Sequence, residues 1–311
     1  MNKHILFVHI PKTAGTSFRL AAKKEFSKEN TFYDYSPSST ETSRYILDYV
    51  YEKQDMYKLS QKFKQHNKLF LSGHFHAGKY MPLFETLNVV TFVRNPVDQV
   101  LSHYKHYVKN NNYKKDIITF IKENRFKNIQ SKMLGGRALE LYGFIGLTEE
   151  YNKSIELINS YYGLNLEVLT LNTAVENKKL DELFTIETID LIKKENKKDI
   201  ELYEKAKQIF NKKYKCFTNK QPYTYGLIQE LTNENIRGIA FQKESKKPIE
   251  IEIYNEDKLL TSISCTKYRQ GIASYSLTRK GFVGFDYKFD EPIIEAGNIK
   301  VIVKNTKQEI I

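Results

Sequence analysis

The sequence predicts an α/β protein in which a parallel sheet flanked by helices is followed by a second, smaller all-β sandwich domain. Three short apolar runs, at residues 5–10, 68–72 and 88–93, have the length of buried strands, and helix-compatible segments separate them. After residue 226 the pattern changes to short stretches in which apolar and polar residues alternate, which is typical of antiparallel strands. With 311 residues, 41% of them hydrophobic, the chain is long enough to bury two cores.

The first apolar run leads through a loop into a helix. Residues 5–10 form the expected strand, Pro11 ends it, and residues 18–26 can form a helix. Gly15 lies between them and is expected to free the backbone of the loop. A strand, a tight loop and a helix N-terminus together make an anion site, because N–H groups converge there with the helix dipole behind them.

The side chains of this loop also suit an anion. Lys12, Thr13, Thr16 and Ser17 supply one positive charge and three hydroxyl groups, and Thr16 and Ser17 stand where a helix N-cap would. This set fits a phosphate or a sulfate better than it fits packing. An ordinary strand–turn–helix with a solvated lysine is the plain alternative.

The order of residues does not match a nucleoside-triphosphate loop. A Walker A motif carries its lysine at the end of the loop, whereas Lys12 stands at the start and Gly15 is the only glycine. The order PKTAGTS instead resembles the P-loop-like 5′-phosphosulfate loop of sulfotransferases that use 3′-phosphoadenosine 5′-phosphosulfate (PAPS). That resemblance implies the sulfotransferase fold, PAPS as donor and 3′-phosphoadenosine 5′-phosphate (PAP) as product. It implies that Lys12 neutralises the leaving oxygen and that the nucleotide is cradled by Lys12, Thr13, Ala14, Gly15, Thr16 and Ser17.

The second run is followed by the sequence GHFH, in which His74 is the candidate base. Ligands gather beyond the C-terminal ends of parallel strands, so we expect His74 on the same rim as Lys12. Histidine titrates near neutrality and can accept a proton. The Gly-His pair resembles the catalytic histidine of uronyl 2-O-sulfotransferases, which implies His74 rather than His76. A loop histidine without a catalytic role is the alternative, and Glu85 stays a candidate base because other branches of the family use glutamate.

The third run precedes a second candidate phosphate site. Residues 88–93 are rich in β-branched side chains, and an amphipathic helix is expected at about 97–108. Arg94 at the strand end and Ser102 on the helix can direct a forked cation and a hydroxyl into one place. Arg-x-Pro followed by this Ser resembles the 3′-phosphate-binding element of the same sulfotransferases. A helix-capping Arg and an exposed Ser are the alternative.

Later segments resemble, in the expected order, the carbohydrate-type branch of that family, including bacterial enzymes. They are NIQSKMLG at 128–135, IGLTE at 145–149 and NKKDIELY at 196–203. We expect Thr148 to be the N-cap of a helix and the third segment to lie in one helix from about 187 to 214. Residues 27–44 are expected to form a loop, with a helix from about Thr40. The resemblance spans about residues 4–217, and no catalytic role is assigned to these later segments.

The last part of the chain is expected to fold separately. Residues 218–226 (TNKQPYTYG) indicate a linker between a catalytic domain at 1–217 and a β-sandwich domain at 227–311. Expected strands lie at 247–254, 258–264, 282–289 and 298–303. The pattern resembles a β-sandwich module appended to bacterial glycan-modifying transferases, and it shows no catalytic constellation.

Composition restricts the partners and the compartment. The net charge of +12 implies anionic partners, which are nucleic acid, a membrane surface, or an anionic cofactor and substrate. The resemblance to sulfotransferases implies a nucleotide donor and a glycan acceptor. The positive segment at 105–132 would suit an acidic sugar or be a solvated helix face. Two cysteines without metal-ligand spacing, no signal-peptide pattern and no long apolar stretch favour a cytoplasmic protein without metal.

Two other functions are weaker alternatives. A P-loop kinase should show a Walker A lysine and an acidic residue closing a strand, and a nucleic-acid-binding module should show Arg interleaved with aromatics. Neither pattern is present. The acceptor hydroxyl and the oligomeric state are not indicated by the sequence.

Overall fold

The protein is described by a computed structural model that covers residues 3–135, 137–169, 184–273 and 278–310. The chain forms two compact units. The first, called the N-terminal unit here, comprises Met1–Phe84, Asn88–Arg137 and Phe144–Phe210. The second, the C-terminal unit, comprises Glu85–Leu87, Ala138–Gly143 and Asn211–Ile311. Contacts therefore divide the chain after Phe210 and assign two earlier segments to the C-terminal unit, whereas the expected division falls at residue 217.

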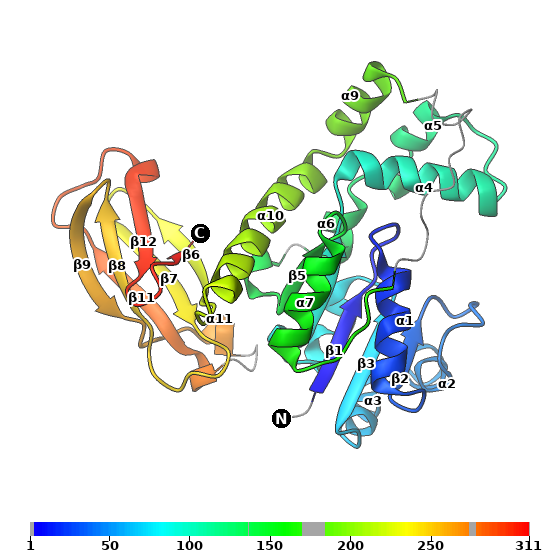
Figure 1. The fold of residues 1–311 in the computed structure, drawn as a ribbon, viewed down its shortest axis with the longest axis horizontal. Helices are drawn as coiled ribbons and strands as arrows, with labels where there is room; N and C mark the ends of the chain where they lie inside the picture. The colour runs from blue at the N-terminus through cyan, green and yellow to red at the C-terminus, as the bar shows by residue number, and fades with distance from the viewer. Residues whose placement is uncertain (1–2, 136, 170–183, 274–277, 311) are drawn as a thin grey trace. The chain divides into compact units, whose positions relative to one another are not determined.

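The N-terminal unit is built on a five-stranded parallel sheet, which confirms the expected α/β class (Figure 1). The strand order is β2-β3-β1-β4-β5. The strands are β1 (Lys3–Val8), β2 (Thr31–Asp34), β3 (Lys68–Gly73), β4 (Val89–Val93) and β5 (Phe144–Leu147). β4 and β5 are buried along their whole length, as expected for parallel strands that are covered on both faces.

The register of the sheet brings the candidate loops to one edge. β1 pairs with β3 so that Val8 lies opposite Gly73, and it pairs with β4 on its other side. The segments after β1, β3 and β4, which contain Lys12, His74 and Arg94, therefore leave the same end of the sheet. The backbone thus brings the three segments to one edge of the sheet, as expected.

Helices connect the strands and cover the sheet. α1 packs against β3 and α7 against β5, and both lie in front of the sheet in Figure 1. The helical elements of this unit are α1 (Gly15–Phe26), α2 (Arg44–Ile46), the π-helix η1 (Leu47–Glu52), α3 (Met56–Phe63), η2 (Ala77–Lys79), η3 (Met81–Leu83), α4 (Pro96–Asn110), α5 (Ile117–Lys122), η5 (Asn124–Phe126), α6 (Ile129–Leu134), α7 (Tyr151–Tyr162), α9 (Ile186–Glu195) and the part of α10 (Lys197–Thr218) up to Phe210. The short helices η4 (Thr86–Asn88) and η6 (Leu139–Leu141) lie on the two earlier segments that are assigned mostly or wholly to the C-terminal unit.

Four local expectations are wrong. The segment 27–44 contains the edge strand β2, because the β-favouring side chains of TFYD pair with β3. The helix expected from Thr40 is split into α2, η1 and α3. The segment 145–149 belongs mainly to β5, and Thr148 is not an N-cap, since its hydroxyl donates to the carbonyl of Val93 at 3.0 Å. The single helix expected at 187–214 is broken at Asn196 into α9 and α10.

The C-terminal unit contains two antiparallel sheets of four strands each, in the orders β10-β11-β7-β6 and β13-β12-β8-β9. Its strands are β6 (Tyr225–Leu231), β7 (Asn235–Phe241), β8 (Glu250–Asn255), β9 (Lys258–Ser264), β10 (Lys267–Tyr268), β11 (Phe282–Lys288), β12 (Ile299–Val303) and β13 (Glu309–Ile310). The short helices α11 (Gln270–Ala273), η7 (Thr278–Gly281) and η8 (Ala296–Asn298) connect them. Residues 219–224 join α10 to β6, within the segment expected as a linker.

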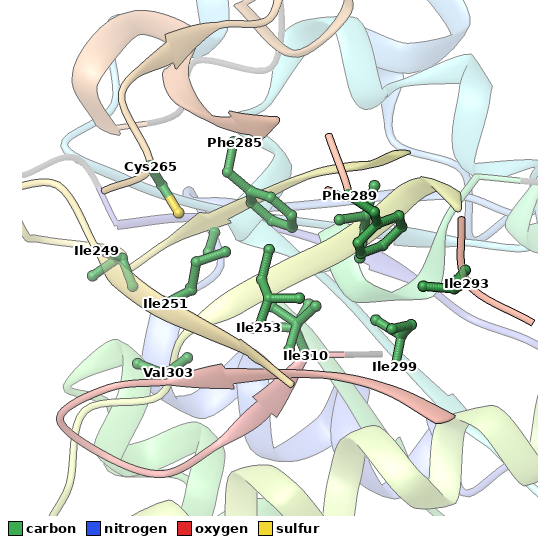
Figure 2. Packing of buried hydrophobic residues seen from close by; sticks show 13 residues of the cluster. Ile249, Ile251, Ile253, Cys265, Phe285, Phe289, Ile293, Ile299, Val303 and Ile310 are labelled. Atoms are coloured by element: carbon green, nitrogen blue, oxygen red, sulfur yellow. The ribbon is translucent and has the colours of Figure 1, made fainter. Parts of the chain in front are cut away.

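One hydrophobic cluster is shared by the two sheets of this unit. Ile251, Ile253 and Val303 reach it from one sheet, and Phe285 from the other (Figure 2). Ile236 of β7 also belongs to the cluster. Their alternation along the strands is the period-two pattern on which the all-β expectation rests. No helix among the described residues is long and apolar enough to cross a membrane.

Candidate active site

The loop between β1 and α1 turns on two residues in the left-handed region. The φ angle is 68° at Lys12 and 62° at Ala14. Such turns direct neighbouring N–H groups toward one point, as in anion-binding nests. Ala14 is the N-cap of α1 and makes no side-chain cap, which leaves the first-turn N–H groups to other acceptors. The hydroxyl of Thr13 is buried and donates to the carbonyl of Ile10 at 2.9 Å, so it stabilises the loop.

Gly15 is required by close packing, which corrects the expectation that it frees the backbone. A Cβ atom at Gly15 would lie 2.0 Å from Cδ2 and 2.2 Å from Nε2 of His9. No real Cβ tolerates such distances, and the His9 ring is buried with 6% exposure. The left-handed conformation is carried by Lys12 and Ala14 instead.

The backbone of His74 is held at the ends of two strands. Its N–H donates to the carbonyl of Asp34 at 3.1 Å, while the N–H of His9 donates to the carbonyl of Gly73 at 3.0 Å. A Cβ at Gly73 would lie 1.8 Å from the Asp34 carbonyl oxygen. The Gly-His pair therefore has a physical reason, because only glycine lets the end of β2 approach so closely.

The imidazole of His74 is oriented by a further hydrogen bond. Nδ1 lies 2.6 Å from the carbonyl oxygen of His9. A carbonyl only accepts, so Nδ1 carries the proton and Nε2 of the neutral ring has a free lone pair. The Tyr35 ring lies edge-on to the His74 ring at a centroid distance of 4.9 Å and fixes its plane from the side. This arrangement suits a proton acceptor.

The surroundings of His74 also favour its neutral form. The side chain is exposed, but protein surrounds much of it, and this burial lowers the pKa of His74 below 6.5. The His9 carbonyl and the negative charge of Glu41 oppose that shift, whereas the positive charge of Arg19 adds to it. At neutral pH the ring is therefore unprotonated at Nε2.

Arg94 lies beside the Lys12 loop. Its Nη1 donates to the carbonyl of Lys12 at 3.3 Å, so the structure brings these two predicted site residues together. The next residues explain the Arg-Asn-Pro sequence locally, because the Asn95 side chain accepts from the N–H of Val97 at 3.0 Å and Pro96 occupies the first turn of α4.

Positive charge is concentrated on this rim. Burial lowers the pKa of Lys12, and the charge of Arg94 lowers it further. Burial also lowers the pKa of His106, with the charge of Lys12 adding to the shift. A cation whose pKa is lowered by a neighbouring positive charge is stabilised by an added anion, so the rim favours a negatively charged ligand.

The other candidate residues vary in their environment. Thr16 is exposed, and Ser17 is buried with 4% exposure. Ser102 is half-buried on the second turn of α4. His76 is exposed on the segment after β3. Glu85 belongs to the C-terminal unit, where its charge acts on Lys243.

Three residues that shape the site are not evident from the sequence patterns. His9 supplies the carbonyl that orients His74, and its own Nδ1 lies 2.8 Å from the hydroxyl of Tyr35. The buried carboxylate of Asp34 accepts from the hydroxyl groups of Tyr51 and Tyr80 at 2.8 and 2.7 Å. The stretch TFYDY could have indicated the strand that ends at Asp34, because aromatic and β-branched residues favour a strand, but it does not indicate the hydrogen bonds of Asp34 and Tyr35.

Among the described residues, no group of His, Cys, Asp or Glu side chains is arranged to hold a metal ion. The rim does fit a nucleotide with more than one anionic group. It offers a nest of N–H groups at the start of α1, the ammonium of Lys12 and the guanidinium of Arg94, all within the N-terminal unit.

Part of the chain is similar to a known family of proteins. Residues 1–140 match the model of the sulfotransferase family, and this span contains the Lys12 loop, His74 and Arg94. No match was found among curated proteins. Among solved structures, the crystal structure of a sulfotransferase from Alicyclobacillus acidocaldarius aligns over 62% of this chain and 96% of its own, with 13% identity and a TM-score of 0.31. A TM-score of this size does not establish a common fold.

Proposed function

We propose that this protein is a sulfotransferase that moves a sulfuryl group from PAPS to a hydroxyl group of a carbohydrate. The family match of residues 1–140 supports sulfuryl transfer. The site supports the choice of donor, because it combines an anion nest with two cations. The single observation that carries the proposal is the hydrogen bond of 2.6 Å from His74 Nδ1 to the His9 carbonyl, which leaves Nε2 free to act as a base on the rim of Lys12.

The chemistry follows from the groups that the chain supplies. The donor provides the sulfuryl group. Nε2 of His74 takes the proton of the acceptor hydroxyl while the hydroxyl oxygen forms the new bond to sulfur. Lys12 and the N–H groups at the start of α1 stabilise the negative charge on the phosphate oxygen whose bond to sulfur breaks. The reaction is balanced, because the proton ends on His74 and the electron pair on the released PAP.

Two separate contacts are proposed to fix the donor. The loop from Lys12 to Ser17 holds the 5′-phosphate through its N–H groups, with Thr13 acting through its backbone because its hydroxyl is used within the loop. Arg94 and Ser102 hold the 3′-phosphate. Because Arg94 also donates to the Lys12 carbonyl, the residue proposed for the 3′-phosphate is hydrogen-bonded to the loop proposed for the 5′-phosphate.

The side chains near His74 suit a carbohydrate acceptor. The rim beside His74 carries Arg19, whose guanidinium lies over the rings of Tyr33 and Tyr35 at 5.3 and 5.0 Å and pairs with the exposed carboxylate of Glu41 at 2.8 Å. Cationic and aromatic groups together suit an acidic sugar. The segment 105–132 contributes less than its sequence indicates, since Lys115 and Arg125 both pair with Glu123 at 3.1 and 2.7 Å.

The C-terminal unit and the two cysteines also have a place in the proposal. We propose that the two antiparallel sheets form an accessory sandwich module for acceptor capture or assembly. Cys216 and Cys265 are both free and buried, which agrees with a reducing, cytoplasmic setting for the reaction.

The test is direct transfer of label. The protein is incubated with PAPS carrying radioactive sulfur and with a panel of acidic and neutral polysaccharides, and the label in the polymer is measured. We expect label in at least one polysaccharide with the unsubstituted protein and none with Lys12→Ala. Label that stays with the nucleotide for every acceptor would argue against a carbohydrate substrate, and phosphorylation of an acceptor from ATP would overturn the reaction class.

A further inference from the structure

We infer that Gln130 is a positioning residue for Arg94, and that Asp199 and Asn196 anchor it from the junction of α9 and α10. The inference rests on the proposed function, because it concerns how the 3′-phosphate of the donor is recognised. It assigns a role to the segments NIQSKMLG and NKKDIELY, whose sequences alone indicate none.

Gln130 holds the main chain of Arg94 with both ends of its amide. Its Oε1 accepts from the N–H of Arg94 at 2.9 Å, and its Nε2 donates to the Arg94 carbonyl at 2.8 Å. The Gln130 side chain is 0% exposed, so water does not compete for these bonds. Arg94 directly follows Val93, the last residue of β4, so its main chain lies beyond the end of that strand. The paired bonds therefore continue the pattern of a strand and fix the direction in which the Arg94 side chain leaves the sheet.

Gln130 is itself fixed by a carboxylate from a distant part of the sequence. Asp199, which is 1% exposed, accepts from the N–H of Gln130 at 3.1 Å through Oδ2. Its Oδ1 accepts from the N–H and the hydroxyl of Ser131 at 2.8 and 2.7 Å. Asp199 thus caps the first turn of α6 in place of Asn128, which is the N-cap and makes no side-chain cap.

A second set of bonds holds the two segments in register. The N–H of Asn128 donates to Oδ1 of Asn196 at 2.8 Å, and the N–H of Asp199 donates to Oδ1 of Asn128 at 3.3 Å. The break between α9 and α10 at Asn196 is what exposes these groups for pairing. The whole path, from Asn196 through Asp199 and Gln130 to Arg94, lies within the N-terminal unit.

The consequence is a pre-oriented guanidinium. The contact of the Arg94 side chain with the Lys12 carbonyl is long, at 3.3 Å, so the backbone has to define where the charge points. Small displacements of a charged donor weaken binding steeply. Loss of Gln130 should therefore act on the 3′-phosphate and not on the 5′-phosphate.

The experiment compares PAP with adenosine 5′-monophosphate (AMP), which lacks only the 3′-phosphate, by calorimetry on the full chain. For Gln130→Met we expect PAP affinity to fall at least about tenfold, the size of a lost charged hydrogen bond, with AMP affinity unchanged within about twofold. Gln99→Met is the matched comparison. Gln99 is also buried, but its Nε2 donates to the Pro11 carbonyl at 3.0 Å, so this variant should weaken PAP and AMP alike.

A double-mutant cycle separates positioning from general damage. In the Arg94→Ala background, Gln130→Met should cause no further loss of PAP affinity, because the residue acts through Arg94. If Gln130→Met does not fold, Gln130→Glu keeps the acceptor for the Arg94 N–H, removes the donor, and should lower the preference for PAP in the same direction.

The outcomes are distinct. Equal losses for PAP and AMP, or additive losses in the cycle, would overturn the role of Gln130 while leaving the proposed function intact. A PAP preference that survives Gln130→Met would do the same. An unsubstituted protein that binds PAP no better than AMP would overturn the assignment of the 3′-phosphate site, and the inference with it.

Discussion

His74 shows how single residues define this site. Its main chain and its ring are each held by a carbonyl, from Asp34 and from His9, so the free nitrogen Nε2 is fixed by the ends of β1 and β2. The glycines beside these contacts make them possible. This arrangement supports the proposal that His74 is the base, because it fixes the ring of an exposed side chain.

Replacement of His74 should separate chemistry from binding. A general base contributes about 10²- to 10⁴-fold, so His74→Ala should lower sulfuryl transfer by that factor while PAP affinity stays within about threefold. His76→Ala is the control, because His76 is exposed two positions further on. Transfer rates and calorimetry measure both quantities. The base is misassigned if His76→Ala abolishes transfer and His74→Ala does not, and neither histidine is the base if neither substitution lowers transfer.

The pH dependence of transfer should reflect the lowered pKa of His74. Only the neutral ring accepts a proton, so the rate rises with pH and levels off above the pKa. Burial places that pKa below the ordinary value of 6.5, with the charge of Arg19 contributing. The rising limb of kcat/KM against pH should therefore have its midpoint below 6.5 and level off at higher pH. A midpoint clearly above 6.5 would disagree with this environment.

At the scale of elements, the site depends on how closely strand ends approach one another. The end of β2 lies against the last residue of β3, and α1 starts directly over the His9 ring. In both places a glycine replaces a side chain that would collide. The candidate site is therefore sensitive to changes that leave every functional group in place.

Gly73→Ala should damage the protein much more than Gly78→Ala. A Cβ at Gly73 meets backbone at 1.8 Å, whereas a Cβ at Gly78 meets nothing within 4 Å. Overpacking of this kind costs about 1–3 kcal/mol, and the backbone neighbour cannot rotate away. Urea unfolding should show that loss of stability for Gly73→Ala, with reduced transfer because His74 follows directly. Equal stability of the two variants would mean that the close approach of β2 and β3 is not required.

At the scale of the whole molecule, much of the fold follows from the sequence. Continuous apolar runs predict β1, β3 and β4, and the alternating pattern predicts β8, β9, β11 and β12 within a few residues. β2 and β5 are each four residues long, too short to stand out beside polar or helix-like neighbours. The break between α9 and α10 is also hidden, because Asn196 caps α9 through the Ile192 carbonyl and at the same time accepts from the N–H of the distant Asn128.

The candidate site shows the same division. Lys12, His74 and Arg94 can be selected from spacing, because each follows a strand that is visible in the sequence. His9, Asp34 and Gln130 cannot, since their roles arise from backbone carbonyls and amides that only the folded chain brings together. Sequence patterns therefore locate the side chains proposed to contact the substrates, and tertiary structure identifies the groups that orient those side chains.

The most direct test of the central claim is the nucleotide preference of the full chain. PAP offers the 5′- and 3′-phosphates for which the Lys12 loop and Arg94 are proposed, whereas ATP lacks a 3′-phosphate. Calorimetry should therefore give a Kd for PAP at least about tenfold below that for ATP, measured without added metal and again with Mg²⁺. Tighter binding of ATP in the presence of Mg²⁺ would contradict the assignment of this site to sulfuryl transfer.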